Sequence, residues 1–172
     1  MKKSGRRAYL KEYKRSVDGG YVYTGERYAP AGDGKRSIFS LCVMTAVLLA
    51  AVLIGGCVNV TGMRNTFYVI LPYIGEAAAL FALCWQLVRL VSGGKNVKAY
   101  VLNAVKRHLP TASLLVSVFA AAVMLAHTVF LFLDGLNDPV ISCVLFYGMH
   151  AASLALGLFI RKLFLSLEWR TF

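Results

Sequence analysis

The sequence contains few charged residues, and acidic residues are the scarcest of them. Only 16% of its 172 residues are charged and just 8 are Asp or Glu, whereas an ordinary soluble domain is about 25% charged. Cysteine is also scarce, at 4 residues, which excludes a disulfide-stapled scaffold. Hydrophobic residues make up 58% of the chain, and this excludes intrinsic disorder. The composition is typical of a protein whose surroundings are largely lipid.

No motif that defines a reaction is present. The sequence lacks a C-x-x-C pair, a phosphate-binding glycine loop, a nucleophile elbow and a zinc-protease motif. Its histidines lack the local spacing of a metal site and the equal depth that a bis-histidine haem needs. We therefore predict no enzymatic activity, no cofactor and no bound metal.

Four long apolar runs account for the hydrophobic content. Each exceeds the roughly 20 helical residues needed to cross a hydrocarbon core of about 30 Å, and none alternates with the period of two found in barrel strands. The runs cover residues 38–60, 66–91, 109–133 and 140–165. We predict an all-α integral membrane protein, a four-helix transmembrane bundle whose helices form two tight hairpins, the first with the second and the third with the fourth.

Almost all lysine and arginine residues lie in segments that would be on the same side of the membrane if each of these runs crosses it once. Ten precede residue 37, five lie in residues 89–108 and three in residues 161–170, whereas the other two connections hold only Arg64. Because cytoplasmic loops are rich in Lys and Arg, we predict that both termini and loop 92–108 are cytoplasmic. We expect a multi-pass protein of the cell membrane, a bacterial plasma membrane being favoured. Orientation accounts for most of the net charge of +11, so we expect no nucleic-acid partner.

The predicted cytoplasmic segments carry an interfacial basic patch that we expect to contact anionic lipid headgroups. Its residues are Lys2, Lys3, Arg6, Arg7, Lys11, Lys14, Arg15, Lys95, Lys98, Lys106 and Arg107. The first 36 residues cannot bury a core alone, so they lie on the membrane or dock on a partner. Within them we predict a short basic helix over 6–15, a turn at 18–20, a strand over 21–24 and a loop over 29–34.

Two further cytoplasmic segments have an amphipathic pattern. Residues 95–106 predict a short helix in the membrane interface, followed by Pro110 in the first turn of the third span. Residues 163–172 have a similar pattern, with Trp169 as an interfacial anchor. The chain thus divides into a basic, Tyr-rich cytoplasmic tail, a transmembrane domain and a cytoplasmic C-terminus, at residues 1–36, 37–167 and 168–172.

Glu76 is the one acidic residue of the sequence that falls within a predicted span. It lies about ten residues from the outer end of that span, or about 15 Å deep at 1.5 Å per residue. A charge near the bilayer midplane is costly. Gly75, Ala79 and Ala82 place small residues along the same helix, as expected where another helix packs closely. Two interpretations stay open for Glu76: a proton or cation site, or a protonated carboxyl hydrogen-bonded between helices.

His150 lies at nearly the same depth as Glu76, about 16 Å from the outer end of the fourth span. It belongs to a stripe of polar and small residues typical of a bundle interior: Cys143, His150, Ser153 and Gly157. We predict a Glu76–His150 pair; His127, several ångströms shallower, fits less well. Aligning residue n with n+74 places Tyr73 on Tyr147 and Glu76 on His150, a weak parallel repeat that also suggests that Glu76 and His150 face each other.

The cysteines have alternative roles. Cys57 and Cys143 are both near the outer face, where they form either an outer disulfide or ordinary small apolar packing. The residues Ile54-Gly55-Gly56-Cys57 resemble the lipobox of bacterial lipoproteins, but the long segment before the first span favours an uncleaved helix.

Three functional hypotheses follow. The leading one is a non-enzymatic accessory or assembly subunit of a larger membrane complex, because the chain is small and has small-residue helix faces and a long basic tail. The alternative is a small proton- or cation-coupled transporter acting as an oligomer, with Glu76 as the coupling carboxylate and His150, His127 and Tyr73 as further candidates. A membrane-embedded enzyme or metal centre ranks third. We expect as partners the bilayer with its anionic headgroups and another membrane protein or a second copy of the chain.

Overall fold

The structure is a computed structural model of the chain. It describes residues 12–16, 19–32, 34–94, 96–135 and 138–171. Six residues of the predicted basic patch lie outside the described residues, as does most of the basic helix predicted over 6–15. These six are Lys2, Lys3, Arg6, Arg7, Lys11 and Lys95.

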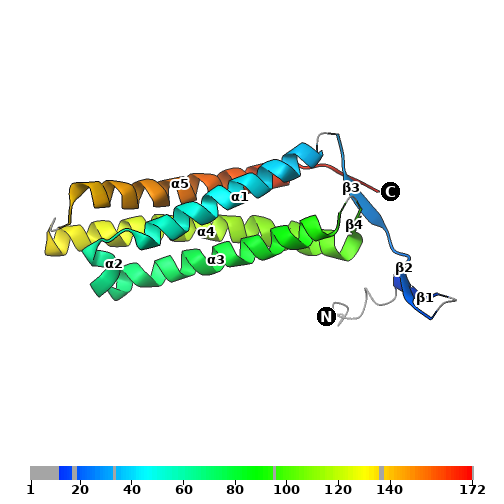
Figure 1. Cartoon of the computed structure of the whole chain (residues 1–172), viewed down its shortest axis with the longest axis horizontal. Coiled ribbons are helices and arrows are strands. Elements are labelled where there is room, and N and C mark those ends of the chain that lie inside the picture. The colour runs from blue at the N-terminus through cyan, green and yellow to red at the C-terminus, as the bar shows by residue number, and fades with distance from the viewer. Residues whose placement is uncertain (1–11, 17–18, 33, 95, 136–137, 172) are drawn as a thin grey trace, which may run out of the picture.

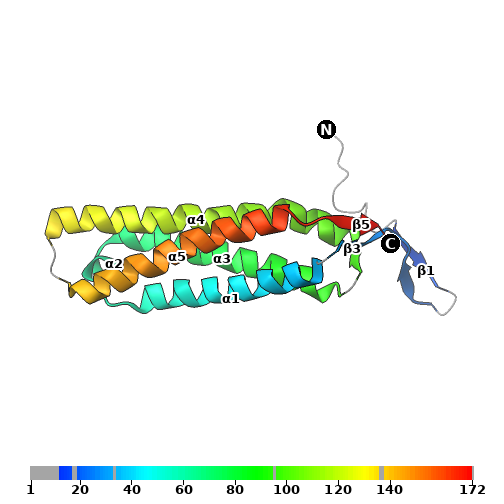
Figure 2. The ribbon, with the colours of Figure 1, turned by 90° about the horizontal axis from the view of Figure 1, so that it is seen from above.

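Four long helices form the body of the molecule and run alongside one another (Figures 1 and 2). Each is long and apolar enough to cross a membrane, which confirms the predicted all-α membrane protein with four spans. They are α1 (Gly34–Cys57), α3 (Phe67–Ser92), α4 (Ala99–Asp134) and α5 (Val140–Leu165). A short helix, α2 (Thr61–Asn65), joins α1 to α3.

The helices pack in an order that differs from two tight hairpins. α4 lies between α3 and α5 and contacts both extensively. α1 packs mainly on α5 and only slightly on α3. One reason is Gly55 of α1, where an added Cβ would lie 3.2 Å from His150 Nε2, so the missing side chain lets α1 approach α5.

Helix α4 begins ten residues before the start predicted at residue 109. The separate amphipathic helix predicted over 95–106 is wrong, because from Ala99 onward this segment is continuous with the membrane span. Its apolar residues Leu102 and Val105 are fully buried in the core rather than lying in the membrane interface. The connection between α3 and α4 is correspondingly short.

Pro110 lies inside α4 rather than in its first turn. Proline removes one backbone hydrogen bond from a helix, and nearby hydroxyl groups supply others. Thr111 Oγ1 donates to the carbonyl of Arg107 at 3.1 Å, and Ser113 Oγ donates to the carbonyl of Pro110 at 3.0 Å. Such side-chain bonds are one way in which membrane helices tolerate proline.

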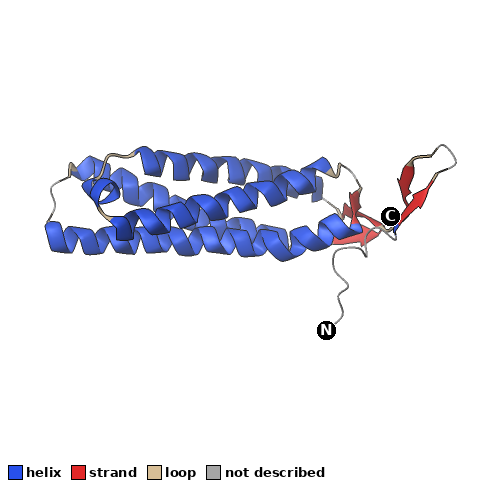
Figure 3. Ribbon diagram, turned by 90° about the horizontal axis from the view of Figure 1, so that it is seen from below, coloured by secondary structure: helices blue, strands red, loops and turns tan. Residues whose placement is uncertain are grey.

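Two small sheets lie at one end of the bundle (Figure 3). Strands β1 (Tyr13–Arg15) and β2 (Tyr21–Tyr23) form an antiparallel hairpin. This confirms the strand predicted from residue 21, whereas the basic helix predicted over 6–15 is wrong at β1. Tyr13 lies opposite Tyr23, and their rings meet edge to face at 5.3 Å. Such cross-strand aromatic pairs favour a strand over a helix at this position.

The second sheet joins three distant segments of the chain. Strand β3 (Arg27–Pro30) pairs antiparallel with β4 (Val97–Lys98) on one side and with β5 (Trp169–Thr171) on the other. The loop predicted over 29–34 is therefore wrong at its first two residues, which belong to β3, and at Gly34, which begins α1. The amphipathic pattern predicted over 163–172 is helical only as far as Leu165, where α5 ends. Trp169 is half-buried against the protein core rather than free to anchor in lipid.

The interior of the bundle contains the predicted stripe on α5. All four of its residues are buried: Cys143, His150, Ser153 and Gly157. Gly157 allows α4 to come close, because an added Cβ would overlap Ser117 Oγ. At this crossing Ser117 Oγ donates a hydrogen bond of 2.9 Å to the carbonyl of Leu154. Small residues and one hydroxyl group thus set the distance between α4 and α5.

Candidate functional site

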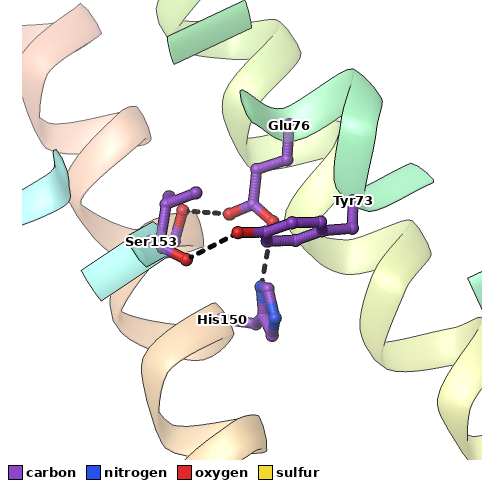
Figure 4. A network of polar contacts seen from close by, with 5 residues as sticks. Tyr73, Glu76, His150 and Ser153 are labelled. Atoms are coloured by element: carbon purple, nitrogen blue, oxygen red, sulfur yellow. Dashed lines mark hydrogen bonds and ion pairs between the residues drawn. The ribbon is translucent and has the colours of Figure 1, made fainter. Parts of the chain in front are cut away.

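Glu76 of α3 and His150 of α5 meet inside the bundle (Figure 4). His150 Nδ1 lies 2.9 Å from Glu76 Oε2, and both side chains are fully buried. Phe67 and Val140 begin the two helices at the same end of the bundle. At 1.5 Å per residue, both side chains are then about 14–15 Å from that end. The predicted Glu76–His150 pair is confirmed as a structural contact.

The contact has the distance of an ion pair but not the geometry of a hydrogen bond, because the His150 ring N–H does not point at Glu76 Oε2. Two such atoms attract only when one proton lies on the pair, since a bare imidazole lone pair would repel a carboxylate. Three arrangements satisfy this: an imidazolium with a carboxylate, an imidazole protonated at Nδ1 with a carboxylate, or an imidazole with a carboxylic acid. The first and third are neutral overall, and the second carries one negative charge.

Ser153 completes the coordination of the carboxylate. Its hydroxyl donates to Glu76 Oε1 at 2.5 Å, and it is fully buried. Ser153 lies three residues after His150 on α5, so one face of this helix supplies partners for both carboxylate oxygens. The sequence placed Ser153 on the interior stripe but did not identify its bond to Glu76.

Tyr73 lies one turn before Glu76 and covers the pair. Its ring meets the His150 ring edge to face, with centroids 6.1 Å apart and planes at 87°. Its hydroxyl donates to the carbonyl of Val52 in α1 at 3.2 Å. Gly56 makes room for this hydroxyl, because an added Cβ would overlap it. Tyr73 therefore helps to enclose the pair but bonds to α1 rather than to the carboxylate.

The second ring nitrogen of His150 has no hydrogen-bond partner among the residues that the structure describes. His150 Nε2 is buried, and it faces α1 at Gly55. A buried nitrogen without a partner is costly. It is a position at which the ring can bond to a water molecule, as a donor when Nε2 carries a hydrogen and as an acceptor when it does not.

His127 belongs to a separate polar cluster nearer the end of the bundle that carries α2. Its Nδ1 lies 3.2 Å from the hydroxyl of Tyr147, which in turn lies 2.8 Å from Thr128 Oγ1. The ring of Phe146 packs against both histidines, with centroids 4.7 Å from His127 and 4.6 Å from His150. His127 is thus outside the Glu76–His150 pair, in line with its poorer predicted fit.

One polar contact at that end has no counterpart in any pattern of the sequence. Asp138 accepts hydrogen bonds from the backbone N–H and the hydroxyl of Thr61, with lengths between 2.5 and 3.0 Å. It therefore ties the connection between α4 and α5 to the first residue of α2. The two residues are 77 positions apart, and no local pattern indicates their pairing.

Cys57 and Cys143 both carry free thiols, so the structure contains no disulfide between them. Cys143 is buried, as small apolar packing predicts, whereas Cys57 is exposed. Within the described part of the chain, no three residues of the His, Cys, Asp and Glu types come close enough to hold a metal ion.

The described members of the basic patch all lie at the sheet end of the bundle. Four of them are exposed: Lys14, Arg15, Lys106 and Arg107. The fifth, Lys98, donates a 3.1 Å hydrogen bond to the Tyr13 hydroxyl and lies 5.3 Å from the ring centroids of both Tyr13 and Tyr23. It therefore fastens the β1–β2 hairpin to the start of α4.

The two tyrosines beneath Lys98 have opposite electrostatic environments. Hydrogen bonds from Tyr100 and Lys98 lower the pKa of Tyr13. Burial, followed by the hydrogen bond that Tyr23 donates to Glu12, raises the pKa of Tyr23 to about 12. The neighbouring Lys98 ammonium thus favours the ionised form of Tyr13, and the neighbouring Glu12 carboxylate favours the protonated form of Tyr23.

Comparison with known proteins found no match: no protein-family model, curated protein or solved structure is similar to this chain. The chemistry of the site follows from its own residues.

Proposed function

We propose that this protein is a small proton- or cation-coupled transporter that acts as an oligomer, with Glu76 as the coupling carboxylate and His150 as its partner. The observation that supports this is the 2.9 Å contact between the two side chains, both fully buried within helices able to span a membrane. Ionisable residues inside membrane helices are costly, and they commonly mark proton relays or ion pathways.

The single proton of the pair provides the coupling. Adding or removing a proton changes the net charge of a site away from water, and a net charge there is costly. Proton exchange therefore requires a rearrangement that admits water, and a ligand that favours one arrangement shifts this equilibrium. His150 Nε2, without a partner among the described residues, is the position from which exchange starts. Because side chains fill the core of one bundle, the substrate path lies between copies of the chain.

A test that needs no known substrate is the charge displacement that follows a proton or sodium concentration jump on a solid-supported membrane. We expect a transient current from the wild type and at least about a tenfold smaller one from Glu76→Gln, because the substituted amide cannot titrate. Ser153→Ala is the matched control: it removes a hydrogen bond to the same carboxylate but no titratable group.

Equal currents from the wild type and Glu76→Gln, or no current from either, would contradict the proposal. If Glu76→Gln fails to fold, His150→Gln tests the same pair from α5, and an undiminished current from that variant also contradicts it.

A second candidate is the accessory or assembly subunit. A groove of about 190 Å³ lies between α3 and α4, lined by small residues that include Ala79, Ala82 and Ala112. Gln86 also lines this groove, and its buried Oε1 has no partner among the described residues. An amide without a partner in lipid is costly, and a neighbouring membrane helix could both fill the groove and donate to this oxygen.

Co-purification from native membranes tests the accessory role. We expect Gln86→Leu to lose a partner that the wild type retains, whereas Phe81→Leu, on an exposed position of the same helix, keeps it. A monomer free of any associated protein in all three samples would overturn this candidate.

A further inference from the structure

A groove of about 440 Å³ lies where α3 ends and α4 begins, beside strand β4. Its volume is within the range of small-molecule sites, about 300–1,000 Å³. Three segments line it: the last two turns of α3, the connection to α4, and the first residues of α4. The groove is at the sheet end of the bundle, well away from the Glu76–His150 pair.

Two cations line this groove, and none of the described residues that line it is acidic. Arg89 has no hydrogen-bond or ion-pair partner among the described residues. Lys98 uses one donor on the Tyr13 hydroxyl, and an ammonium group has three. Ser92 and Asn96 add polar groups to the lining. A guanidinium, an ammonium and neutral polar groups together match a phosphate group.

The wall on the membrane side of the groove is apolar and continues along α3. Trp85 and Val88 line the groove and are 58% and 57% exposed, and Phe81 one turn earlier is 75% exposed. Their spacing of four and three residues places them on one face of the helix. This exposed face runs from the cationic end of the groove toward the middle of α3, along the direction that a lipid acyl chain would follow.

We propose that this groove binds an anionic phospholipid, with Arg89 and Lys98 on the headgroup phosphate and an acyl chain along Phe81, Trp85 and Val88. A free phosphate ion would meet the same two cations but would leave the apolar wall unused. The continuity of the groove with an exposed apolar helix face therefore favours the lipid over the ion. The proposal does not depend on the transport function, since it uses none of the residues around Glu76.

Quenching of Trp85 by brominated lipid tests this site. Trp169→Phe leaves Trp85 as the sole tryptophan of the full-length chain. In nanodiscs of phosphatidylcholine, we expect a small fraction of brominated phosphatidylglycerol to quench Trp85 more strongly than the same fraction of brominated phosphatidylcholine. Removing one basic residue near a membrane surface should lower such a preference about fivefold, so Arg89→Gln is expected to have this effect.

Arg64→Gln is the matched control, because Arg64 is an exposed basic residue of α2 that neither lines the groove nor belongs to the basic patch. The comparison of the two brominated lipids needs no Arg89 variant, so it holds even if Arg89→Gln does not fold. Equal quenching by both lipids would overturn the proposal. Displacement of brominated phosphatidylglycerol by millimolar inorganic phosphate would also overturn it, because the occupant would then be a soluble phosphate ion.

Discussion

At the scale of single residues, the carboxylates of Glu76 and Glu12 each have polar partners. Glu76 has His150 and Ser153 on its two oxygens. At the sheet end, Tyr23 donates to Glu12, while Lys98 lies over the same aromatic ring. Each of these charged groups thus lies against a polar or oppositely charged neighbour, which offsets part of the cost of its burial.

The pKa of Tyr23 provides a prediction at this scale. Burial and the Glu12 carboxylate raise it to about 12, so the protonated phenol favours the folded state. This stabilisation is fully present below about pH 10, the pKa of an unperturbed tyrosine, and is lost as the pH rises through 12. We expect NMR titration of labelled tyrosines to show one residue titrating near 12, and Tyr23→Phe identifies it.

The variant Glu12→Gln tests the cause of that shift. We expect it to lower the pKa of Tyr23 without restoring the ordinary value, because burial is the larger cause and remains. A pKa of Tyr23 that is the same in Glu12→Gln and in the wild type would show that the carboxylate does not act on it.

The central pair was predictable from the sequence, but its surroundings were not. Counting residues from the helix ends placed Glu76 and His150 at one depth, and one buried acidic residue needs a partner. The bonds of Ser153 and Tyr73 depend on which way each side chain turns. Those directions are set by Gly56 and by the packing of α1, which no spacing along a single helix indicates.

At the scale of helices and strands, close approach depends on glycine. Gly157→Ala should lower the free energy of unfolding by about 1–3 kcal/mol, the usual cost of overpacking, because its Cβ would overlap Ser117 Oγ. Gly148→Ala on the same helix is the control. Its Cβ would meet nothing within 4 Å, so the helix propensity of alanine should stabilise the protein by up to about 1 kcal/mol.

Circular dichroism during unfolding in mixed micelles measures both glycine variants. Equal stability of Gly157→Ala and Gly148→Ala would show that Gly157 does not set the distance between α4 and α5.

The ends of the elements were the least predictable feature. The four spans follow from apolar length alone, and the α5 boundaries match those predicted, residues 140–165. The start of α4 and strands β3 and β5 do not follow from local patterns. They depend on pairing between segments near residues 28, 97 and 170, which are far apart in the chain.

At the scale of the whole molecule, one end of the bundle gathers the basic N-terminal segment, the α3–α4 connection and the C-terminal strand into a single sheet. The distribution of Lys and Arg predicts that this end is cytoplasmic. Asn59 and Ser166 are both exposed. Asn59 follows the end of α1 and Ser166 follows the end of α5, and these two helix ends lie at opposite ends of the bundle (Figure 1). The two residues are suitable positions for single cysteines in a chain without its four native ones.

A membrane-impermeant maleimide distinguishes the two orientations. In intact cells we expect it to label Asn59→Cys at once and Ser166→Cys only after the membrane is permeabilised. Labelling of Ser166→Cys in intact cells would reverse the predicted orientation.

The central claim is that Glu76 and His150 hold one exchangeable proton inside the bundle. Infrared difference spectroscopy of the protein in liposomes, between about pH 8 and pH 5, detects the carboxyl stretch of a buried acid directly. We predict a carboxyl band in the wild type that is absent from Glu76→Gln and shifted in Ser153→Ala, whose carboxyl loses a hydrogen bond. Identical difference spectra for the wild type and Glu76→Gln would contradict the account.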